Sequence, residues 1–572
     1  MAKIEKKEQI LKRLVFLYGT EKGRFAFEEL EKKLEARPVI KASQKEKWTE
    51  KDVFAITYGD TFKEAGRTPL NVLNDFLGEY VGDKLSFLHL LPFYPYTSDD
   101  GFSVVDYRQV DSNLGSWEDV SQLSQNYKLV FDGVINHVSC SSDYMQEQCK
   151  GNEAFKDFII TLDPKTDTSL VTRPRNLPLL HEFETVDGPK WFWTTFSRDQ
   201  VDLNFKNPYV LIEIIDVLLF YAQQGAKMIR LDAIPFLWKE LGTNCSHLPQ
   251  THEVIKLIRD VINEVSPDTI LLSETNVPHK ENISYFGNKG DEAQIIYNFS
   301  LPPLILFSLT TGQADKLTQW AQTIEKIGDD ATYLNITATH DGIGVRPTEG
   351  ILSNEERQML VDLARKHGGA VNEKVNPDGS VSPYELNVTY FDAINNPKGS
   401  LDVSVLVDRF LLSQLIPLSF IGIPGIYIHS LIGSRNDYEG VKETGAPRSI
   451  NRKKLDYSLL KKELDDKDSL RAQVLKKYLT CIEIRKSLTA FHPNAEQEVL
   501  DWGKQLFVNK RMNKKTGETV LAVHNVADTE QVIQVETVYP SLLNGKDVLS
   551  ETDKRGEADW VLAPYQVSWI KL

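Results

Sequence analysis

Short apolar runs alternate with polar loops and amphipathic stretches over residues 50–430 of the chain. Uninterrupted apolar runs with helical stretches between them are typical of parallel strands that are buried on both faces. Eight such runs predict an α/β fold in which the strands close into a (β/α)8 barrel, the TIM-barrel architecture. The runs cover residues 53–58, 85–91, 129–135, 226–231, 269–273, 294–299, 333–339 and 423–429.

The spacing of these runs divides the chain into three predicted parts. Residues 1–50 combine helical periodicity with many Lys and Glu and predict a helical N-terminal extension. Residues 51–490 form the barrel, whose intervals at about 139–205 and 342–405 are too long for one helix and predict inserted loops or subdomains. Short strand-like runs after residue 490 predict a small antiparallel β domain over 491–572.

Composition and charge narrow the classes of function. The 572 residues include 66 Lys and Arg against 81 Asp and Glu, which gives a net charge of −15. Such an acidic chain is a poor nucleic-acid binder, because neutralising phosphates needs a basic face. The four cysteines lack CxxC spacing, which disfavours a disulfide scaffold or a zinc cluster. No apolar signal segment and no apolar stretch long enough for a membrane span is visible, so we expect a cytoplasmic protein.

Polar residues directly follow four of the runs, where a barrel places its catalytic groups. Three carboxylates are therefore expected to meet at one mouth of the barrel. A carboxylate pair suits glycoside chemistry, with one group as nucleophile and the other as a general acid of raised pKa. The residues are His137 after the third run, Arg230 and Asp232 after the fourth, Glu274 after the fifth, and His340 and Asp341 after the seventh.

Each of these residues also has a structural interpretation. An Asp at a strand end is often a helix cap, a lone Glu is often solvated or paired, and a His is often packed in a core. Four strand ends that carry suitable residue types in order favour the catalytic interpretation.

The same strand ends resemble the four motif regions of the α-amylase superfamily of glycoside hydrolases and transglycosylases. The motifs read DGVINH at 132–137, MIRLDA at 228–233, LSETN at 272–276 and THDGIG at 339–344. The resemblance implies that Asp232 is the nucleophile, that Glu274 is the general acid/base, and that Asp341 grips the sugar hydroxyls beside subsite −1. Arg230 would orient Asp232. The implied ligands of the glucose hydroxyls at these motifs are His137 and His340.

Further segments resemble the sucrose phosphorylase branch of that superfamily. The resemblance implies a pocket closed around one glucose, because Arg452 pairs with Asp99 at the glucose 4-OH and so excludes polymers. The implied glucose-binding residues are Asp99, Phe102, Phe196, Gln200 and Arg452. The segments read DDGF at 99–102, RPR at 173–175, FSRDQVD at 196–202, PYELN at 383–387 and INR at 450–452.

An incoming phosphate dianion needs positive partners and neutral donors. The branch resemblance places Tyr384 on a loop whose Tyr meets phosphate, and it aligns Arg175 with an R-P-R segment of the first insertion. Arg448 and Lys239 are further candidates. For each of these Arg and Lys side chains, the structural alternative is an ordinary charged residue on the protein surface.

The loop after the nucleophile, residues 235–252, differs from that of the sucrose enzymes. It resembles relatives acting on 2-O-α-glucosylglycerate and, more loosely, those acting on glucosylglycerol. Glycerate carries a carboxylate, so its site should offer cations or hydrogen-bond donors, and the candidates are Lys239, Thr243, Asn244 and His247. The structural alternative is that Lys239 begins a solvated helix and that His247 is a packing residue.

The resemblance implies a retaining glycoside phosphorylase that converts an α-glucoside and phosphate into α-glucose 1-phosphate. The expected donor is 2-O-α-glucosylglycerate, with sucrose or glucosylglycerol as alternatives. A hydrolase or transglucosidase of the same fold is a more distant alternative. A barrel that only binds partners is another, against which the three intact carboxylates argue. We expect the α-glucoside and phosphate as ligands, no cofactor, no metal, and a monomer or homodimer.

Overall fold

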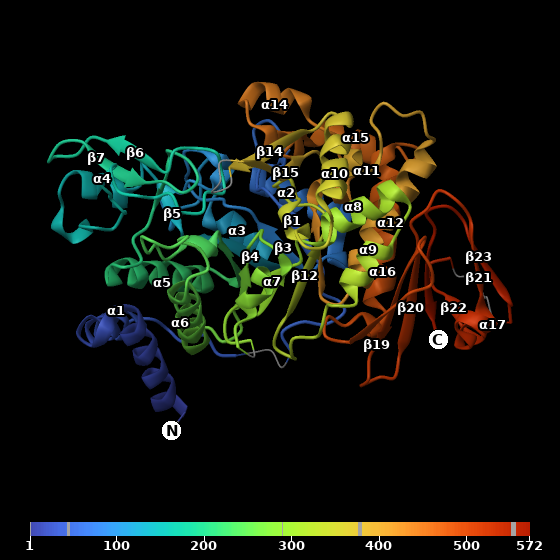
Figure 1. Cartoon of the computed structure of the whole chain (residues 1–572), viewed down its shortest axis with the longest axis horizontal. Coiled ribbons are helices and arrows are strands. Elements are labelled where there is room, and N and C mark those ends of the chain that lie inside the picture. The colour runs from blue at the N-terminus through green and yellow to red at the C-terminus, as the bar shows by residue number, and fades with distance from the viewer. Residues whose placement is uncertain (1, 43–45, 289, 376–379, 551–555) are drawn as a thin grey trace.

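The chain is described by a computed structural model that covers residues 2–42, 46–288, 290–375, 380–550 and 556–572 (Figure 1). Its central strands are β1 (Phe54–Thr57), β3 (Phe87–Leu90), β4 (Lys128–Val134), β9 (Ala226–Asp232), β10 (Ile270–Ser273), β11 (Ile295–Tyr297), β12 (Thr332–Ile336) and β16 (Ile423–Tyr427). These eight parallel strands close into a barrel in the order β1-β16-β12-β11-β10-β9-β4-β3. Each strand coincides with one of the eight apolar runs, so the predicted (β/α)8 fold is confirmed.

Helices around the barrel explain why the strand runs are apolar on both faces. All residues of β10 are buried, because one face of the strand fills the barrel and the other meets helices. Helix α5 (Pro208–Gln223) begins where the side chain of Asn207 accepts a hydrogen bond from the Tyr209 amide, with proline in the first turn. It packs against β9 and thereby supports the end of that strand, Asp232.

The first insertion follows the carboxyl end of β4. Its strands β5 and β8 pair antiparallel and set His137 opposite Asp202. A second hairpin, β6–β7, lies farther from the barrel (Figure 1). The elements are β5 (His137–Ser139), α4 (Asp143–Cys149), β6 (Leu180–Phe183), β7 (Lys190–Trp193) and β8 (Gln200–Asp202).

The second insertion follows the carboxyl end of β12 and lies over the same end of the barrel (Figure 1). Its strands form a three-stranded sheet in the order β13-β15-β14, in which Ile343 pairs with Leu386 and Gly344 with Glu385. This pairing brings residues some forty positions apart to one edge of the barrel mouth. The elements are β13 (Ile343–Gly344), α10 (Asn354–Lys366), β14 (Ala370–Val375), β15 (Val381–Asn387) and α11 (Tyr390–Ile394).

The N-terminal helix α1 (Ala2–Glu35) kinks at Gly19, whose φ of 78° is left-handed. Arg13 anchors it by ion pairs of 2.8 Å to Glu253 and 2.6 Å to Asp260 on α6 (Pro249–Val265). The helix ends well before residue 50, the predicted limit of the extension, because a proline at 38 disfavours helical backbone at the residue before it.

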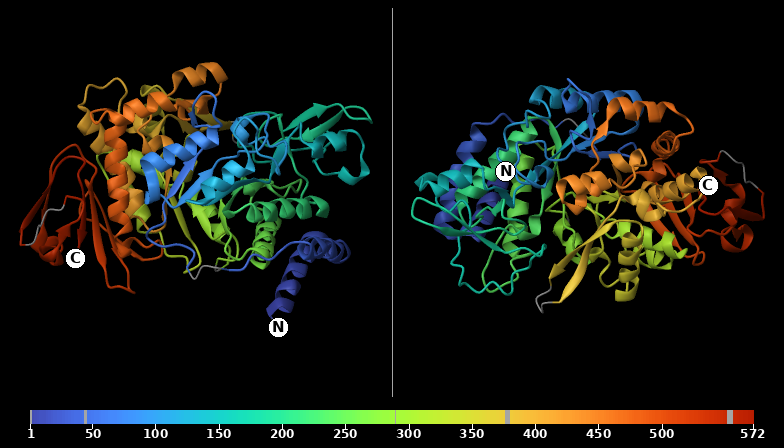
Figure 2. Two further views of the ribbon diagram at one scale, coloured as in Figure 1. Left: turned by 180° about the vertical axis from the view of Figure 1, so that it is seen from behind. Right: turned by 90° about the horizontal axis from the view of Figure 1, so that it is seen from above.

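The C-terminal residues form antiparallel sheets on the far side of the barrel from α1 (Figure 2). The main sheet has the order β18-β19-β20-β24-β22, and β21 pairs with β23. In the described ranges, no helix is long and apolar enough to cross a membrane. The strands are β18 (Glu496–Leu500), β19 (Leu506–Met512), β20 (Thr519–Asn525), β21 (Gln531–Gln534), β22 (Lys546–Asp547), β23 (Asp559–Leu562) and β24 (Val567–Lys571).

Candidate active site

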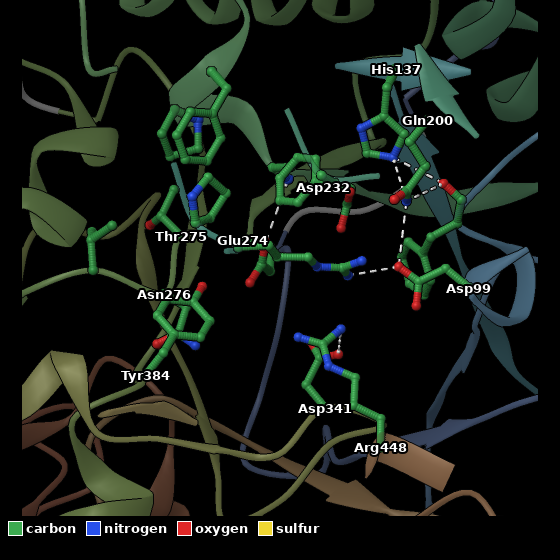
Figure 3. A pocket seen from close by; sticks show the side chains of 18 of the residues that line it. Asp99, His137, Gln200, Asp232, Glu274, Thr275, Asn276, Asp341, Tyr384 and Arg448 are labelled. Atoms are coloured by element: carbon green, nitrogen blue, oxygen red, sulfur yellow. Dashed lines mark hydrogen bonds and ion pairs between the residues drawn. The ribbon is translucent and has the colours of Figure 1, made fainter. Parts of the chain in front are cut away.

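A cavity opens at the carboxyl ends of the barrel strands, with walls from both insertions (Figure 3). Its volume is about 760 Å³ with the open space at its mouth included. The predicted site residues that line it are Asp99, Phe102, His137, Arg175, Phe196, Gln200, Asp232, Glu274, His340, Asp341 and Tyr384.

Asp232 and Glu274 enter the cavity from neighbouring strands. Asp232 is the last residue of β9, and Glu274 directly follows β10, which pairs with β9 in parallel. The residue after Asp232, Ala233, has a left-handed φ of 51°, which is uncommon for alanine. In this turn the Ala233 amide donates to Glu274 Oε2 at 3.4 Å. Such backbone strain is often found at functional sites.

Arg230 lies behind the two carboxylates. Its Nη1 is 2.9 Å from Asp232 Oδ1, and its Nη2 is 4.0 Å from Glu274 Oε2. On its other side it is ion-paired with the fully buried Asp132, which also lies 2.7 Å from His89 Nε2. The guanidinium is therefore fixed from the rear and has the geometry predicted for orienting Asp232.

The two central carboxyls titrate as a pair. Burial, with the negative charges of Glu274 and Asp132, raises the pKa of Asp232 despite the opposing charge of Arg230. Burial, with the charge of Asp341, also raises the pKa of Glu274. Two such groups hold one proton between them near neutral pH. Arg230 lies closer to Asp232 than to Glu274, so its positive charge favours ionisation of Asp232 over that of Glu274.

Asp341 is the third carboxylate and remains charged. Burial favours its neutral form, but Arg448, at 2.6 Å, and Arg452, at 3.4 Å, hold the pKa of Asp341 well below its usual range. Arg448 also makes contacts of 2.6 and 3.0 Å to the buried carboxylate of Glu385. Asp341 is therefore a fixed anion beside the reacting pair.

One end of the cavity, which we call the glucose end because predicted glucose-binding residues lie there, is built around two successive aspartates. Asp99 and Asp100 both have left-handed φ values, of 54° and 49°. Arg175 lies 2.8 Å from Asp99, whereas Arg452 lies 2.6 Å from Asp100 and 3.9 Å from Asp99. The structure thus contains an ion pair of Arg452 with Asp99, and a shorter one joins Arg452 to Asp100. These ion pairs close this end of the cavity.

Aromatic rings form the walls of the glucose end. The ring of Phe102 stacks on that of His340 with centroids 4.9 Å apart, and Phe196 packs against His137 at 5.1 Å. Burial lowers the pKa of His340 to about 3 and that of His137 to about 4. Both imidazoles are therefore neutral at physiological pH. Gln200 Nε2 donates to the carbonyl oxygen of Phe102 at 3.1 Å, which fixes its amide beside His137.

The opposite end, which we call the acceptor end, lies beyond Glu274. Figure 3 shows Asn276 and Tyr384 on the other side of Glu274 from Asp99. The Tyr384 carbonyl accepts a hydrogen bond from the Val345 amide at 3.1 Å, and Arg346 also lines the cavity. The acceptor end thus combines a residue after β10 with residues of the second insertion.

The predicted acceptor residues Lys239, Thr243, Asn244 and His247 are not among the described residues that line the cavity. Lys239 is buried, with its Nζ 2.6 Å from Asp202 and 2.9 Å from Asn136 Oδ1, and it is not among the described residues that line the cavity. His247 also lies behind the wall, where Nδ1 is 2.9 Å from the Tyr285 hydroxyl. In this part of the loop, Cys245 and His247 both have left-handed backbone, with φ values of 51° and 56°.

Sequence reasoning did not single out Arg346, Asn276 or Asp100. Arg346 stands two residues beyond the motif at 339–344, and Asn276 is the last residue of the motif at 272–276. Extending the motif at 339–344 by two residues would have identified Arg346, whereas Asn276 already lies inside its motif. No group of three or more His, Cys, Asp or Glu in the described part of the chain could hold a metal ion.

Comparisons with known proteins identify the family. The protein-family model described as "Alpha amylase, catalytic domain" matches residues 84–343. The chain is 46% identical to a glucosylglycerate phosphorylase of Spirochaeta thermophila, with 97% of both chains covered. It is 45% identical to a glucosylglycerate phosphorylase of Allomeiothermus silvanus, with 99% of both chains covered.

A solved structure of a more distant relative has the same fold. The sucrose 6F-phosphate phosphorylase from Thermoanaerobacter thermosaccharolyticum matches with a TM-score of 0.72 at 25% identity, covering 83% of this chain and 94% of that one. The resemblance to the sucrose phosphorylase branch is therefore confirmed. With identities of 45–46% over almost its full length, the chain belongs to the family of the glucosylglycerate phosphorylases within the α-amylase superfamily.

Proposed function

We propose that the chain is a retaining phosphorylase that transfers glucose from 2-O-α-glucosylglycerate to inorganic phosphate. The products are glycerate and α-glucose 1-phosphate. The observation that carries the proposal is the convergence of Asp232, Glu274 and Asp341 in one cavity, beside the ion pairs of Asp99 with Arg175 and of Asp100 with Arg452. The two full-length relatives named as glucosylglycerate phosphorylases support the choice of donor.

In the first step, the ionised Asp232 attacks the anomeric carbon while Glu274 gives its proton to the departing glycerate oxygen. The glycosidic C–O bond breaks and a β-glucosyl ester of Asp232 forms. The contact of 2.9 Å from Arg230 keeps Asp232 charged and oriented for this attack. The raised pKa of Glu274 keeps the acid protonated until it is needed.

In the second step, a phosphate oxygen attacks the same carbon from the face that glycerate has left. Glu274, now ionised, takes the phosphate proton, and the ester bond to Asp232 breaks. Two inversions give α-glucose 1-phosphate and restore both carboxyls. These steps use only side chains and phosphate, without a cofactor.

Phosphate must bind where glycerate was, beside cations. Arg175 makes one contact of 2.8 Å to Asp99 and is partly exposed at the cavity, so it keeps donors for an anion. Tyr384 supplies a neutral hydroxyl, because burial holds the pKa of its phenol well above the usual range. We assign phosphate to these two residues.

The test is phosphorolysis of 2-O-α-glucosylglycerate, glucosylglycerol and sucrose with and without phosphate, with assays of glucose 1-phosphate and free glucose. We expect phosphate-dependent glucose 1-phosphate and a kcat/KM for glucosylglycerate at least about tenfold above that for sucrose, with glucosylglycerol intermediate. Free glucose released at a rate independent of phosphate would instead identify a hydrolase. Sucrose as the best donor would refute the acceptor assignment.

A further inference from the structure

The acceptor end contains an arginine that neither the motifs nor the proposed chemistry uses. Arg346 begins a short 3-10 turn, Arg346–Thr348, directly after β13. It lines the cavity together with Asn276 and Tyr384. Gly344, two residues earlier, lies so close to Asn276 that a Cβ there would be 2.5 Å from its Oδ1. Arg346 therefore belongs to the acceptor end rather than to the glucose end.

The three arginines among the described lining residues differ in how fully they are paired. Arg448 uses both Nη atoms and Nε on the carboxylates of Asp341 and Glu385. Arg175 is tied to Asp99 at the glucose end. The nearest carboxylate to Arg346 is Glu281 at 3.8 Å, beyond hydrogen-bonding distance. Within the described ranges, its buried Nε has no hydrogen-bond partner.

The Arg346 side chain is 18% exposed, and leaving its buried Nε unpaired is costly unless a ligand completes it. The planar guanidinium of arginine can donate two parallel hydrogen bonds to one carboxylate. Asn276 Oδ1 is another buried polar atom without a hydrogen-bond partner in the described part of the chain, and Asn276 also lines the cavity. It can accept a hydrogen bond from a hydroxyl. Arg346 and Asn276 together would therefore bind a ligand that carries an anionic group next to a hydroxyl.

We propose that Arg346 binds the carboxylate of glycerate and is the residue that selects glucosylglycerate over neutral α-glucosides. This inference rests on the proposed function, since it assigns the acceptor subsite of the same cavity. Glu281 positions Arg346 from outside and is itself 3.4 Å from His247 Nε2. His247 thus reaches the acceptor indirectly, through Glu281 and Arg346.

The test compares a charged and a neutral donor in the Arg346→Gln variant. We expect kcat/KM for glucosylglycerate to fall about tenfold to a hundredfold, while that for glucosylglycerol, which lacks the carboxylate, changes by less than about threefold. Arg346→Lys keeps the positive charge but loses the planar guanidinium, so the fall in kcat/KM for glucosylglycerate should be intermediate. In the reverse direction, the KM for glycerate should rise and that for glycerol should not.

The matched control is Lys374→Gln, which removes a neighbouring positive charge that does not line the cavity. It should leave the ratio of the two donors unchanged. Equal losses for both donors in Arg346→Gln would overturn the assignment. If the wild type made no glucose 1-phosphate from glucosylglycerate, the proposed function itself would fail. An active wild type with an unchanged donor ratio in the variant would refute only the role of Arg346.

Discussion

The two ends of the cavity are built differently. At the glucose end, Asp99, Asp100 and Asp341 are each tied to an arginine within 2.6–2.8 Å. At the acceptor end, Arg346 has its nearest carboxylate at 3.8 Å. One end is held rigid by its own ion pairs, whereas the other keeps hydrogen-bonding capacity for a ligand.

This difference matches what each end must recognise. Every candidate donor carries the same glucose, so a preorganised surface serves all of them. The donors differ only beyond the glycosidic oxygen, where the acceptor end provides the contacts. A substitution at the glucose end should therefore lower kcat/KM by the same factor for all donors. A substitution at the acceptor end should change the ratio of kcat/KM between donors. Substitutions between the two ends should abolish the chemistry.

The largest effect is expected for Asp232→Asn. An amide cannot form the glucosyl ester, so kcat should fall by several orders of magnitude for every donor. The amide can still accept the hydrogen bond from Arg230, so the fold should survive, which thermal unfolding would show. Near-wild-type phosphorolysis by this variant would mean that the active site is assigned wrongly.

Glu274→Gln should produce the next largest loss, and the loss should depend on the leaving group. For glucosylglycerate we expect about 10²–10⁴-fold lower kcat/KM, because glycerate leaves as a poor, unprotonated alkoxide. Glucosyl fluoride needs no proton, so its first step should be much less affected. Equal losses for the two donors would assign Glu274 another role.

The pH profile checks the same residue. Burial and the charge of Asp341 raise the pKa of Glu274, so the acid is protonated below that pKa and ionised above it. For wild-type enzyme with glucosylglycerate, kcat/KM should therefore fall as the pH rises through this pKa. The alkaline fall should be absent when glucosyl fluoride reacts in the first step. An alkaline fall of the same size with both donors would contradict the assignment.

Asp99→Asn tests the glucose end. Losing the charge that Arg175 and Arg452 face should lower kcat/KM about tenfold to a hundredfold. Because glucose is common to all donors, the losses for glucosylglycerate, glucosylglycerol and sucrose should agree. The assay uses saturating phosphate, since Arg175 also serves the phosphate site. A changed ratio of kcat/KM between these donors would contradict the assignment of glucose and acceptor to separate ends of the cavity.

The barrel and the central carboxylates could be predicted because their signals are local. A strand buried on both faces is a continuous apolar run, and its last residue is also the one that enters the cavity. Asp232 ends β9, and Glu274 follows β10 immediately, so their positions along the chain already determine where they lie.

The acceptor end could not be predicted in the same way. Arg346 reaches the cavity because β13 pairs with β15, a contact between segments about forty residues apart. Lys239 follows the nucleophile closely in sequence, yet its side chain turns to a buried carboxylate from the first insertion. Neither the long-range pairing nor the left-handed turns at Ala233 and Cys245 leaves a periodic signal in the sequence.

The smallest effect on donor choice is expected for Lys239→Met, because its ammonium is bound to Asp202 and Asn136 behind the cavity wall. The ratio of glucosylglycerate to glucosylglycerol should remain within about twofold of the wild type. Stability should respond instead, because removing one partner of a buried ion pair costs about 3–5 kcal/mol. Asp202 retains hydrogen bonds of 2.8 and 2.6 Å from Thr195, which favours the lower part of that range.

Lys206→Met is the matched control in a neighbouring segment, since its pair with Glu240 is exposed on both sides and should contribute under about 1 kcal/mol. Denaturant unfolding of the two variants gives the stability difference, and the two-donor assay gives the specificity. If Lys239 met the acceptor carboxylate, as its place after the nucleophile predicts, Lys239→Met would lose the preference for glucosylglycerate. If Lys239→Met loses stability but keeps the preference for glucosylglycerate over glucosylglycerol, Arg346 remains the cation that binds the acceptor carboxylate.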